Sequence, residues 1–373
     1  MGGQILPPIM GASAFIMAET TGVSYSTIAL AAVFPALLFY LGVIAQVHFR
    51  AGRDNLKGIP KADLPKVKEV LKERGHLLLP IIGLVVLLFN NIPVSYAAFY
   101  TIVFTVIVSS LRKSTRMSIA DIFDALADGA RQSLSVMAAC ALVGIIIGVV
   151  SLTSFGSVMT SSIMSVGAGS LFLTLLFTML ASMLLGMGLP SIPAYIITAT
   201  MAAPALANFD IPILVAHMFV FYFGLFANIT PPVALASFAA AGISGGDPMK
   251  TGFQSLKLAL AGFIVPFMFV YNPAMLMLDT TDSLITSKEF PLPSFWVIAS
   301  ITVTAIVGIT ALSAAVEGYF KGPLNVLMRI VLAAGAFMLI VPEQMTDVLG
   351  MLIVALVIAW NIFQANKDQA SHA

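Results

Sequence analysis

Charged residues are scarce in this sequence. Asp, Glu, Lys and Arg together make up 9% of the 373 residues, whereas hydrophobic residues make up 59%, and the mean hydropathy is +1.02. Soluble domains carry about 25% charged residues, so most of this chain has no aqueous face. The composition excludes a soluble globular protein. It predicts an all-α polytopic membrane protein that crosses the lipid bilayer many times.

Cysteine, metal-ligand clusters and enzyme motifs are also missing. The single cysteine, Cys140, excludes an internal disulfide and a cysteine-based metal cluster. No phosphate-binding loop and no paired acid and base are present, and Gly186-Met187-Gly188 lacks the strand and third glycine of a nucleotide-binding turn, so no enzyme is predicted. With a net charge of +1 and no basic, aromatic-rich stripe, nucleic acid is not expected as a partner.

The segment 217–242 is long and apolar enough to cross a bilayer, but Asn228-Ile229-Thr230-Pro231-Pro232 interrupts it. Two prolines remove two backbone donors, and Pro231 disfavours helical angles at Thr230. A helix is therefore predicted to stop near Phe226 and to restart near Pro232. Unwound backbone is tolerated at membrane depth only where protein or a water-filled cavity receives its polar groups. Such a broken helix is typical of the ion and substrate site of a secondary transporter.

A similar pattern occurs at the start of the chain. Gln4-Ile5-Leu6-Pro7-Pro8-Ile9-Met10-Gly11-Ala12-Ser13 aligns without a gap with Asn228-Ile229-Thr230-Pro231-Pro232-Val233-Ala234-Leu235-Ala236-Ser237. This agreement predicts an internal repeat, in which residues 1–20 are the second half of a broken helix and the two broken helices run in opposite directions. The alternative is an ordinary N-terminal segment that contains Pro-Pro.

The segment 171–206 is apolar throughout, but glycines and prolines at 186–193 divide it. Each flank has only about 15 residues, fewer than the roughly 20 that cross a bilayer. Two short arms around an uncharged tip predict a re-entrant hairpin. The alternative is two tilted spans joined by a tight turn at the far surface.

The other apolar segments predict ordinary spans. They are 26–46, the pair 77–89 and 94–111, 133–150, 256–270, 295–314, 324–341 and 349–363. Leu64–Arg74 predicts a surface helix, and Ser118–Arg131 an amphipathic interfacial helix or, alternatively, a solvated linker helix. Tyr271–Pro293 is a polar segment. The chain is thus divided into 1–46, the remainder of a first repeat; 47–131, a basic loop, two spans and the interfacial helix; 132–278, a second repeat; and 279–373, a three-span extension.

Basic residues set the predicted orientation. When the spans are threaded alternately, the loops 48–76, 112–131, 243–252 and 317–323 and the tail share one face. That face and its span ends hold every Lys and Arg except Lys288, so it is predicted to be cytoplasmic.

No Asp or Glu lies at mid-membrane depth, and His217 is interpreted as an interfacial or packing residue rather than a proton carrier. A Na⁺ site needs only oxygens, which unwound backbone, hydroxyls and amides supply. The predicted ion-binding residues are Gln4, Gly186, Met187, Gly188, Asn228, Ile229 and Thr230. Helix N-termini after each interruption favour a carboxylate. The predicted substrate-binding residues are Pro7, Pro8, Ser191, Tyr195, Thr198, Pro231 and Pro232. No cofactor is expected beyond Na⁺ as the coupling ion.

Several segments resemble a known family. The sequences GMGLPSIPAYIITATMAAPAL, HMFVFYFGLFANITPPVALASFAAAGISGGDPMKTGF and FIVPFMFVYNPAMLM resemble the large permease of TRAP transporters, in particular the fused permeases of the TAXI subgroup. GGQILPPIMGASAFIMAE resembles the first broken helix of that family. The resemblance covers about residues 1–278, and the remainder resembles the less characteristic C-terminal extension of fused permeases.

The resemblance implies an elevator-type importer in the bacterial inner membrane, usually driven by Na⁺, to which an extracytoplasmic solute-binding protein delivers an organic acid. It also implies two hairpins paired with two broken helices, with Gly186–Pro193 as the second tip. The first hairpin, the spans before it and the small-permease part have no counterpart, so the chain is interpreted as N-terminally incomplete. The alternatives are an inactive remnant, a split subunit that needs a partner, or another ion-coupled anion carrier.

Overall fold

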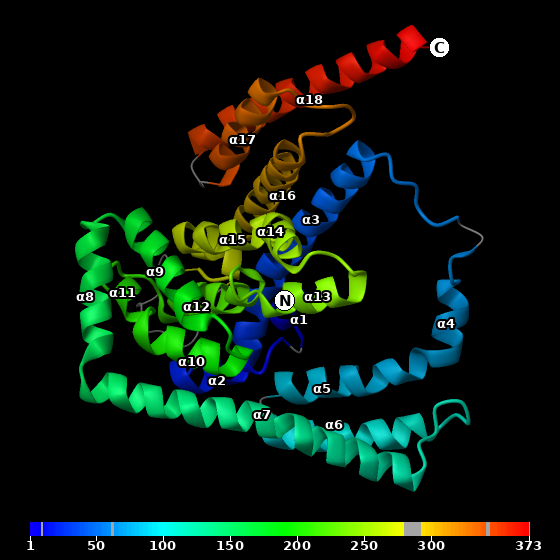
Figure 1. Ribbon diagram of the computed structural model, residues 1–373, viewed down its shortest axis with the longest axis vertical. Coiled ribbons are helices and arrows are strands. Elements are labelled where there is room, and N and C mark those ends of the chain that lie inside the picture. The colour runs from blue at the N-terminus through cyan, green and yellow to red at the C-terminus, as the bar shows by residue number, and fades with distance from the viewer. Residues whose placement is uncertain (9, 61–62, 91, 280–291, 341–343, 373) are drawn as a thin grey trace.

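The computed structural model describes residues 1–8, 10–60, 63–90, 92–279, 292–340 and 344–372, and every regular element within them is helical (Figure 1). This confirms the predicted all-α fold. In chain order the elements are α1 (Gly2–Ile5), α2 (Ser13–Thr21), α3 (Tyr25–Arg53), α4 (Val67–Arg74), η2 (Gly75–Leu78), α5 (Leu79–Phe89), α6 (Val94–Ser109), α7 (Ile119–Leu152), α8 (Phe155–Gly167), α9 (Leu171–Gly186), α10 (Ser191–Met201), α11 (Pro204–Ala207), α12 (Ile213–Phe226), η3 (Ala227–Ile229), α13 (Leu235–Ser244), α14 (Pro248–Leu258), α15 (Leu260–Tyr271), η4 (Pro273–Leu276), α16 (Phe295–Glu317), α17 (Val326–Ile340) and α18 (Gln344–His372).

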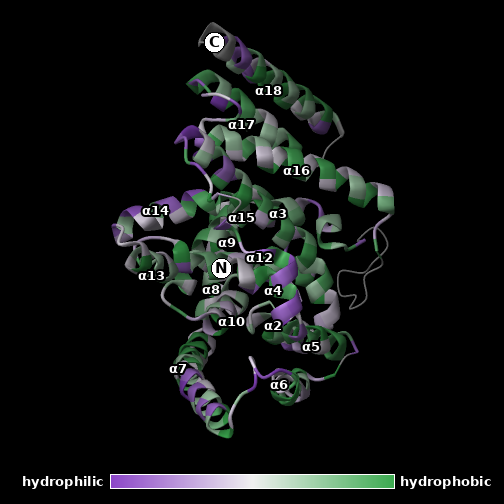
Figure 2. Ribbon diagram, turned by 90° about the vertical axis from the view of Figure 1, so that its right-hand side faces the viewer, coloured by the Kyte–Doolittle hydropathy of each residue, from purple (hydrophilic) through white to green (hydrophobic). Residues whose placement is uncertain are grey.

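In the part of the chain that the structure describes, five helical segments are long and apolar enough to cross a membrane. They are Tyr25–Arg53, Ile119–Leu152, Pro248–Tyr271, Phe295–Glu317 and Met345–Lys367. Figure 2 shows hydrophobic residues over most helices, with hydrophilic residues most evident on α4, on α14 and along part of α7. The length and apolar character of these segments agree with a polytopic membrane protein.

Helix α12 is the centre of the core. All of its residues are buried except Ile213 and His217, so it has no polar face. Helices α2, α9, α10 and α15 pack around it. The ring of Phe219 lies edge-on to that of Phe267, and Phe226 stacks on Phe263. A helix that is apolar on all sides has to be enclosed by other elements. The break that ends α12 therefore lies inside the protein.

Helix α3 forms a second packing centre with α15 and α16. A Cβ at Gly42 of α3 would lie 2.3 Å from the Cβ of Ala261 and 3.2 Å from Cγ2 of Ile309, so the glycine permits both neighbours to approach. Ser313 of α16 donates a hydrogen bond to the Gly42 carbonyl at 3.5 Å. Figure 1 shows α16–α18 at one end of the molecule and α5–α7 at the other.

The predicted division of 118–150 into an interfacial helix and a separate span was wrong. Helix α7 is continuous from Ile119 to Leu152, and the predicted boundary between 131 and 132 falls within it. A capping box, in which Ser118 and Asp121 bond each other's backbone N–H groups, begins the helix, and no proline follows to end it.

Other elements differ in smaller ways. Helix α8 was not predicted, because its many serines hide its hydrophobic periodicity. Helix α17 has 15 residues and is shorter than the span predicted there, whose last residue lies outside the described residues. The predicted surface helix at 64–74 and the paired helices α5 and α6 are confirmed. Most of the polar segment 271–293 also lies outside the described residues.

Candidate functional site

The second break has the predicted form. Helix α12 stops at Phe226, a short 3-10 turn follows, and the chain becomes helical again at Leu235 rather than near Pro232. Thr230 is extended, with a ψ of 122°, as a residue before proline prefers. Its hydroxyl donates a hydrogen bond to the Phe226 carbonyl at 2.8 Å. Residues 228–230 are all buried, so the unwound backbone lies within protein.

The first break follows the same backbone path. Helix α1 stops at Ile5 and α2 begins at Ser13. Met10 and Ala234, which are equivalent in the alignment, both have a positive φ, of 52° and 34°. The N–H of each donates to the carbonyl four residues earlier at 3.1 Å, and the Pro-Pro bond is cis in both segments. The two segments are therefore alike in backbone as well as sequence, while their opposite direction across a membrane stays a prediction.

The hairpin packs directly on the second break. Helices α9 and α10 contact each other, and both contact α12. A Cβ at Gly186 would lie 2.8 Å from the carbonyl oxygen of Gly224 and 3.0 Å from its Cα, so the two backbones touch. The Asn228 amide donates a hydrogen bond to the Leu189 carbonyl at 3.1 Å. Gly188, at a φ of +75°, provides the left-handed turn of the tip.

The structure thus brings together most of the predicted ion-binding residues. Gly186, Met187 and Gly188 form the hairpin tip, and residues 228–230 form the second break. The hydrogen bond from Asn228 to the Leu189 carbonyl joins the break to the hairpin. Gln4 belongs to the first break. Its Oε1 is buried and has no hydrogen-bond partner among the described residues.

Two predicted substrate-binding side chains are engaged within the protein. Tyr195 is 1% exposed, and its hydroxyl is hydrogen-bonded to Nδ1 of His217 at 2.7 Å and to Oγ1 of Thr20 at 3.2 Å. This triad joins α10, α12 and α2. The Thr198 hydroxyl is buried and donates to the Ala194 carbonyl at 2.9 Å. The sequence indicated Tyr195 as a candidate but not its link to His217, because the two lie on different helices.

The remaining predicted substrate-binding residues lie at the two interruptions. Ser191 is half-buried at the start of α10. Pro231 is half-buried and Pro232 is exposed, while Pro7 and Pro8 are half-buried in the first break. None of these residues is closed off in the core as Tyr195 and Thr198 are.

A cavity of about 330 Å³ lies beside the second break, and residues close to each of the two breaks line it. Ile229 and Ser237 line it from the second break, Gly2 from α1, Tyr40 from α3 and Ser255 from α14. Its volume falls within the range of about 300–1,000 Å³ of small-molecule sites. Sequence analysis did not predict this cavity, because its walls come from segments far apart in the chain.

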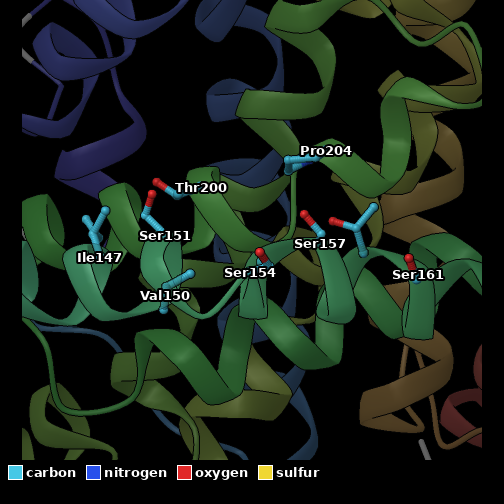
Figure 3. Close-up of a pocket in the computed structure, with 10 residues that line it drawn as sticks. Ile147, Val150, Ser151, Ser154, Ser157, Ser161, Thr200 and Pro204 are labelled. Atoms are coloured by element: carbon cyan, nitrogen blue, oxygen red, sulfur yellow. The ribbon is translucent and has the colours of Figure 1, made fainter.

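A larger cavity of about 530 Å³ lies between α7, α8 and the end of α10 (Figure 3). It is rich in hydroxyl groups. These belong to Ser151, Ser154, Ser157, Thr160, Ser161 and Thr200. None of the predicted site residues lines it. Sequence analysis missed it together with α8.

Residues 1–284 match the model of a protein family, the DctM component of the tripartite ATP-independent periplasmic transporters. The chain belongs to this family. The resemblance found in the sequence is confirmed at that level, whereas the TAXI subgroup stays a prediction. No curated protein and no solved structure matches the chain. This DctM-family chain is a permease component of a membrane transporter rather than an enzyme, and the match contains both breaks and the hairpin but ends before α16.

Proposed function

We propose that this permease imports a small organic acid coupled to Na⁺ across a bacterial inner membrane, and that an extracytoplasmic solute-binding protein delivers the acid. The observation that carries the proposal is the hydrogen bond between Asn228 and the Leu189 carbonyl. It joins the non-helical backbone of the partly exposed hairpin tip to the buried non-helical backbone of the second break. Carbonyls at helix C-termini and unwound backbone are the groups that hold a coupling cation in broken-helix transporters.

The organic acid is proposed to bind in the 330 Å³ cavity, which Ile229 of the second break lines. Helix α13 begins at Leu235, and its first-turn residues Ala236 and Ser237 line the cavity. A helix N-terminus favours a carboxylate through its N–H groups and its dipole. The Tyr40 hydroxyl is a further donor on a lining side chain, whereas the Ser237 and Ser255 hydroxyls already donate to the Ile229 and Thr251 carbonyls.

Uptake by proteoliposomes tests the proposal. The full chain is reconstituted with a solute-binding protein and with a permease portion that supplies the family's first hairpin, and organic-acid uptake is measured with and without a Na⁺ gradient. Asn228→Ala is expected to weaken the Na⁺ dependence of uptake at least about tenfold, because it removes an amide and the contact that holds the tip.

Asn90→Ala is the matched control, since Asn90 is exposed and its amide bonds only the Val86 carbonyl within its own helix. Uptake that ignores the Na⁺ gradient would contradict the coupling ion. Equal effects of the two substitutions would contradict the site.

One observation favours a second proposal, that the chain works as a subunit completed by a separate partner. The side-chain oxygens of Gln4 and Ser13 are buried at the first break without a hydrogen-bond partner among the described residues. Buried polar atoms usually have one. Co-purification of a chain that contacts this break supports the proposal, and full Na⁺-driven uptake by this chain and its binding protein alone contradicts it.

A further inference from the structure

The Glu317 carboxylate lies in a position that is electrostatically unfavourable for a negative charge. It is the last residue of α16, and its side chain is fully buried. The C-terminus of a helix carries partial negative charge, which opposes a carboxylate there. Glutamate is almost never fully buried unless it is paired. The position therefore needs a compensating group of positive charge.

Three cations from two other helices provide that charge. Lys257 Nζ of α14 lies 2.9 Å from Glu317 Oε1, and Arg53 and Arg50 of α3 lie 3.4 and 3.8 Å from Oε2. Arg53 also donates a hydrogen bond to the Glu317 carbonyl at 2.9 Å. Neither carboxylate oxygen has a partner in hydrogen-bond geometry among the described residues, so charge attraction holds the side chain. The carboxylate is the point at which α3, α14 and α16 meet.

Helix α14 connects this carboxylate with the second break. A Cβ at Gly252 would lie 3.0 Å from Cγ of Pro231 and 3.6 Å from the Cβ of Ala234, so α14 packs closely on the break. Lys257 follows five residues later on the same helix, about 7.5 Å along its axis at 1.5 Å per residue. One short helix thus touches the prolines at one point and Glu317 at another.

We infer that Glu317 is a positioning residue for the ion and substrate site: its ion pair with Lys257 fixes α14, and α14 fixes residues 231–234 of the second break. Glu317 lies beyond the residues that match the family model, whereas Lys257 and the break lie within them. The C-terminal helices are therefore a working part of the permease rather than an appendage. A neutral side chain at 317 would leave Lys257 without a carboxylate partner among the described residues, whereas Arg50 and Arg53 keep Asp54.

Hydrogen exchange followed by mass spectrometry tests the inference on the full chain in nanodiscs. Glu317→Gln and Lys257→Met are each expected to raise amide exchange at least about tenfold in 248–258 and in 229–236, because each removes the ion pair of 2.9 Å that joins α14 to α16. Lys257→Arg is expected to restore protection. Lys66→Met is the matched control, since Lys66 forms an exposed pair with Glu69 and is expected to change nothing.

The two variants keep the test decisive if Glu317→Gln fails to fold, because in Lys257→Met the carboxylate retains both arginines. Faster exchange confined to α16–α18, or no change at 229–236 in Lys257→Met, would overturn the inference, since Glu317 would then only anchor its own helix.

The link to transport rests on the proposed function. Glu317→Gln is expected to weaken the Na⁺ dependence of uptake at least about fivefold while the maximal rate changes less. A wild-type protein without Na⁺-driven uptake defeats the proposed function and leaves the exchange result standing. Normal Na⁺ dependence of uptake in Glu317→Gln overturns the inference alone.

Discussion

The two Pro-Pro breaks have the same backbone path but different polar surroundings. At the second break, Asn228 donates to the hairpin tip, and the Ser237 hydroxyl donates to the Ile229 carbonyl at 3.4 Å. At the first break, the side chains at the aligned positions are Gln4 and Ser13, and Gln4 Oε1 and Ser13 Oγ are buried without a hydrogen-bond partner among the described residues. The Asn228 bond depends on the hairpin α9–α10, which packs on α12 and brings its tip to the second break, whereas the Ser237 bond lies between the break and the start of α13.

This comparison separates two requirements of a broken helix. Prolines and their neighbours determine where the helix stops, because they act on the local backbone. The polar groups that unwinding leaves without helical hydrogen bonds also need partners, and another segment of the chain can supply them. At the first break α3 supplies a partner, because the Tyr25 hydroxyl donates to the Pro8 carbonyl at 2.8 Å, but the Gln4 and Ser13 side-chain oxygens stay without one among the described residues.

The largest expected effect comes from pushing the hairpin away from the second break. Gly186→Val is expected to destabilise the protein by about 1–3 kcal/mol, because the added atoms meet the Gly224 backbone, which cannot move aside as a side chain does. Denaturant unfolding in detergent measures it. Gly148→Val in α7 is the control, since nothing lies near a Cβ there. Equal losses in the two variants would show that the hairpin contact has no special weight.

The equivalent amide positions provide the next comparison. Asn228→Ala is expected to cost about 1–3 kcal/mol, because it leaves the Leu189 carbonyl without its buried donor. Gln4→Ala is expected to cost less than about 1 kcal/mol, since its Oε1 has no partner among the described residues to lose. Thermal unfolding of both variants checks this order. A reversed order would mean that the first break is the better-satisfied one.

The triad of Tyr195, His217 and Thr20 links the hairpin to α2, which follows the first break. Tyr195→Phe removes the shared hydroxyl and is expected to cost about 1–2 kcal/mol, mainly because His217 Nδ1 loses its partner. Tyr96→Phe, at an exposed position on α6, serves as the control for loss of a tyrosine hydroxyl. If both variants unfold at the same temperature, the hydrogen bonds of the triad add no stability to the contact between α10, α12 and α2.

The smallest expected effect is at the aligned serines, where the two substitutions are expected to change the free energy of unfolding in opposite directions. Ser13→Ala removes a buried hydroxyl without a partner and is expected to be neutral or to stabilise by up to about 1 kcal/mol. Ser237→Ala removes a long hydrogen bond and is expected to destabilise by about 0.5 kcal/mol. Paired unfolding measurements resolve the sign. Destabilisation by Ser13→Ala would indicate a polar contact at the first break after all.

Local rules explain what sequence analysis predicted correctly. Pro231 and Pro232 end α12 where expected, the glycines at 186 and 188 bound the hairpin tip, and the apolar run of 214–226 is the buried core. The same rules failed at α7, where hydrophobic and amphipathic stretches looked like two elements, and at α8, where serines hid the helix. Hydrophobic periodicity shows which face of a segment is apolar. It does not reveal that one helix continues through a change in composition.

By itself, therefore, the sequence determined that this protein is an all-α membrane protein with two Pro-Pro breaks and a hairpin, because proline geometry and hydrophobic burial act within a short stretch of chain. Only the tertiary structure decided which polar groups meet. The Asn228 amide bonds the Leu189 carbonyl, and the Tyr195 hydroxyl bonds both His217 and Thr20. Glu317 forms ion pairs with cations of α3 and α14. Those pairings depend on how distant helices pack, and the spacing of residues along one segment does not encode them.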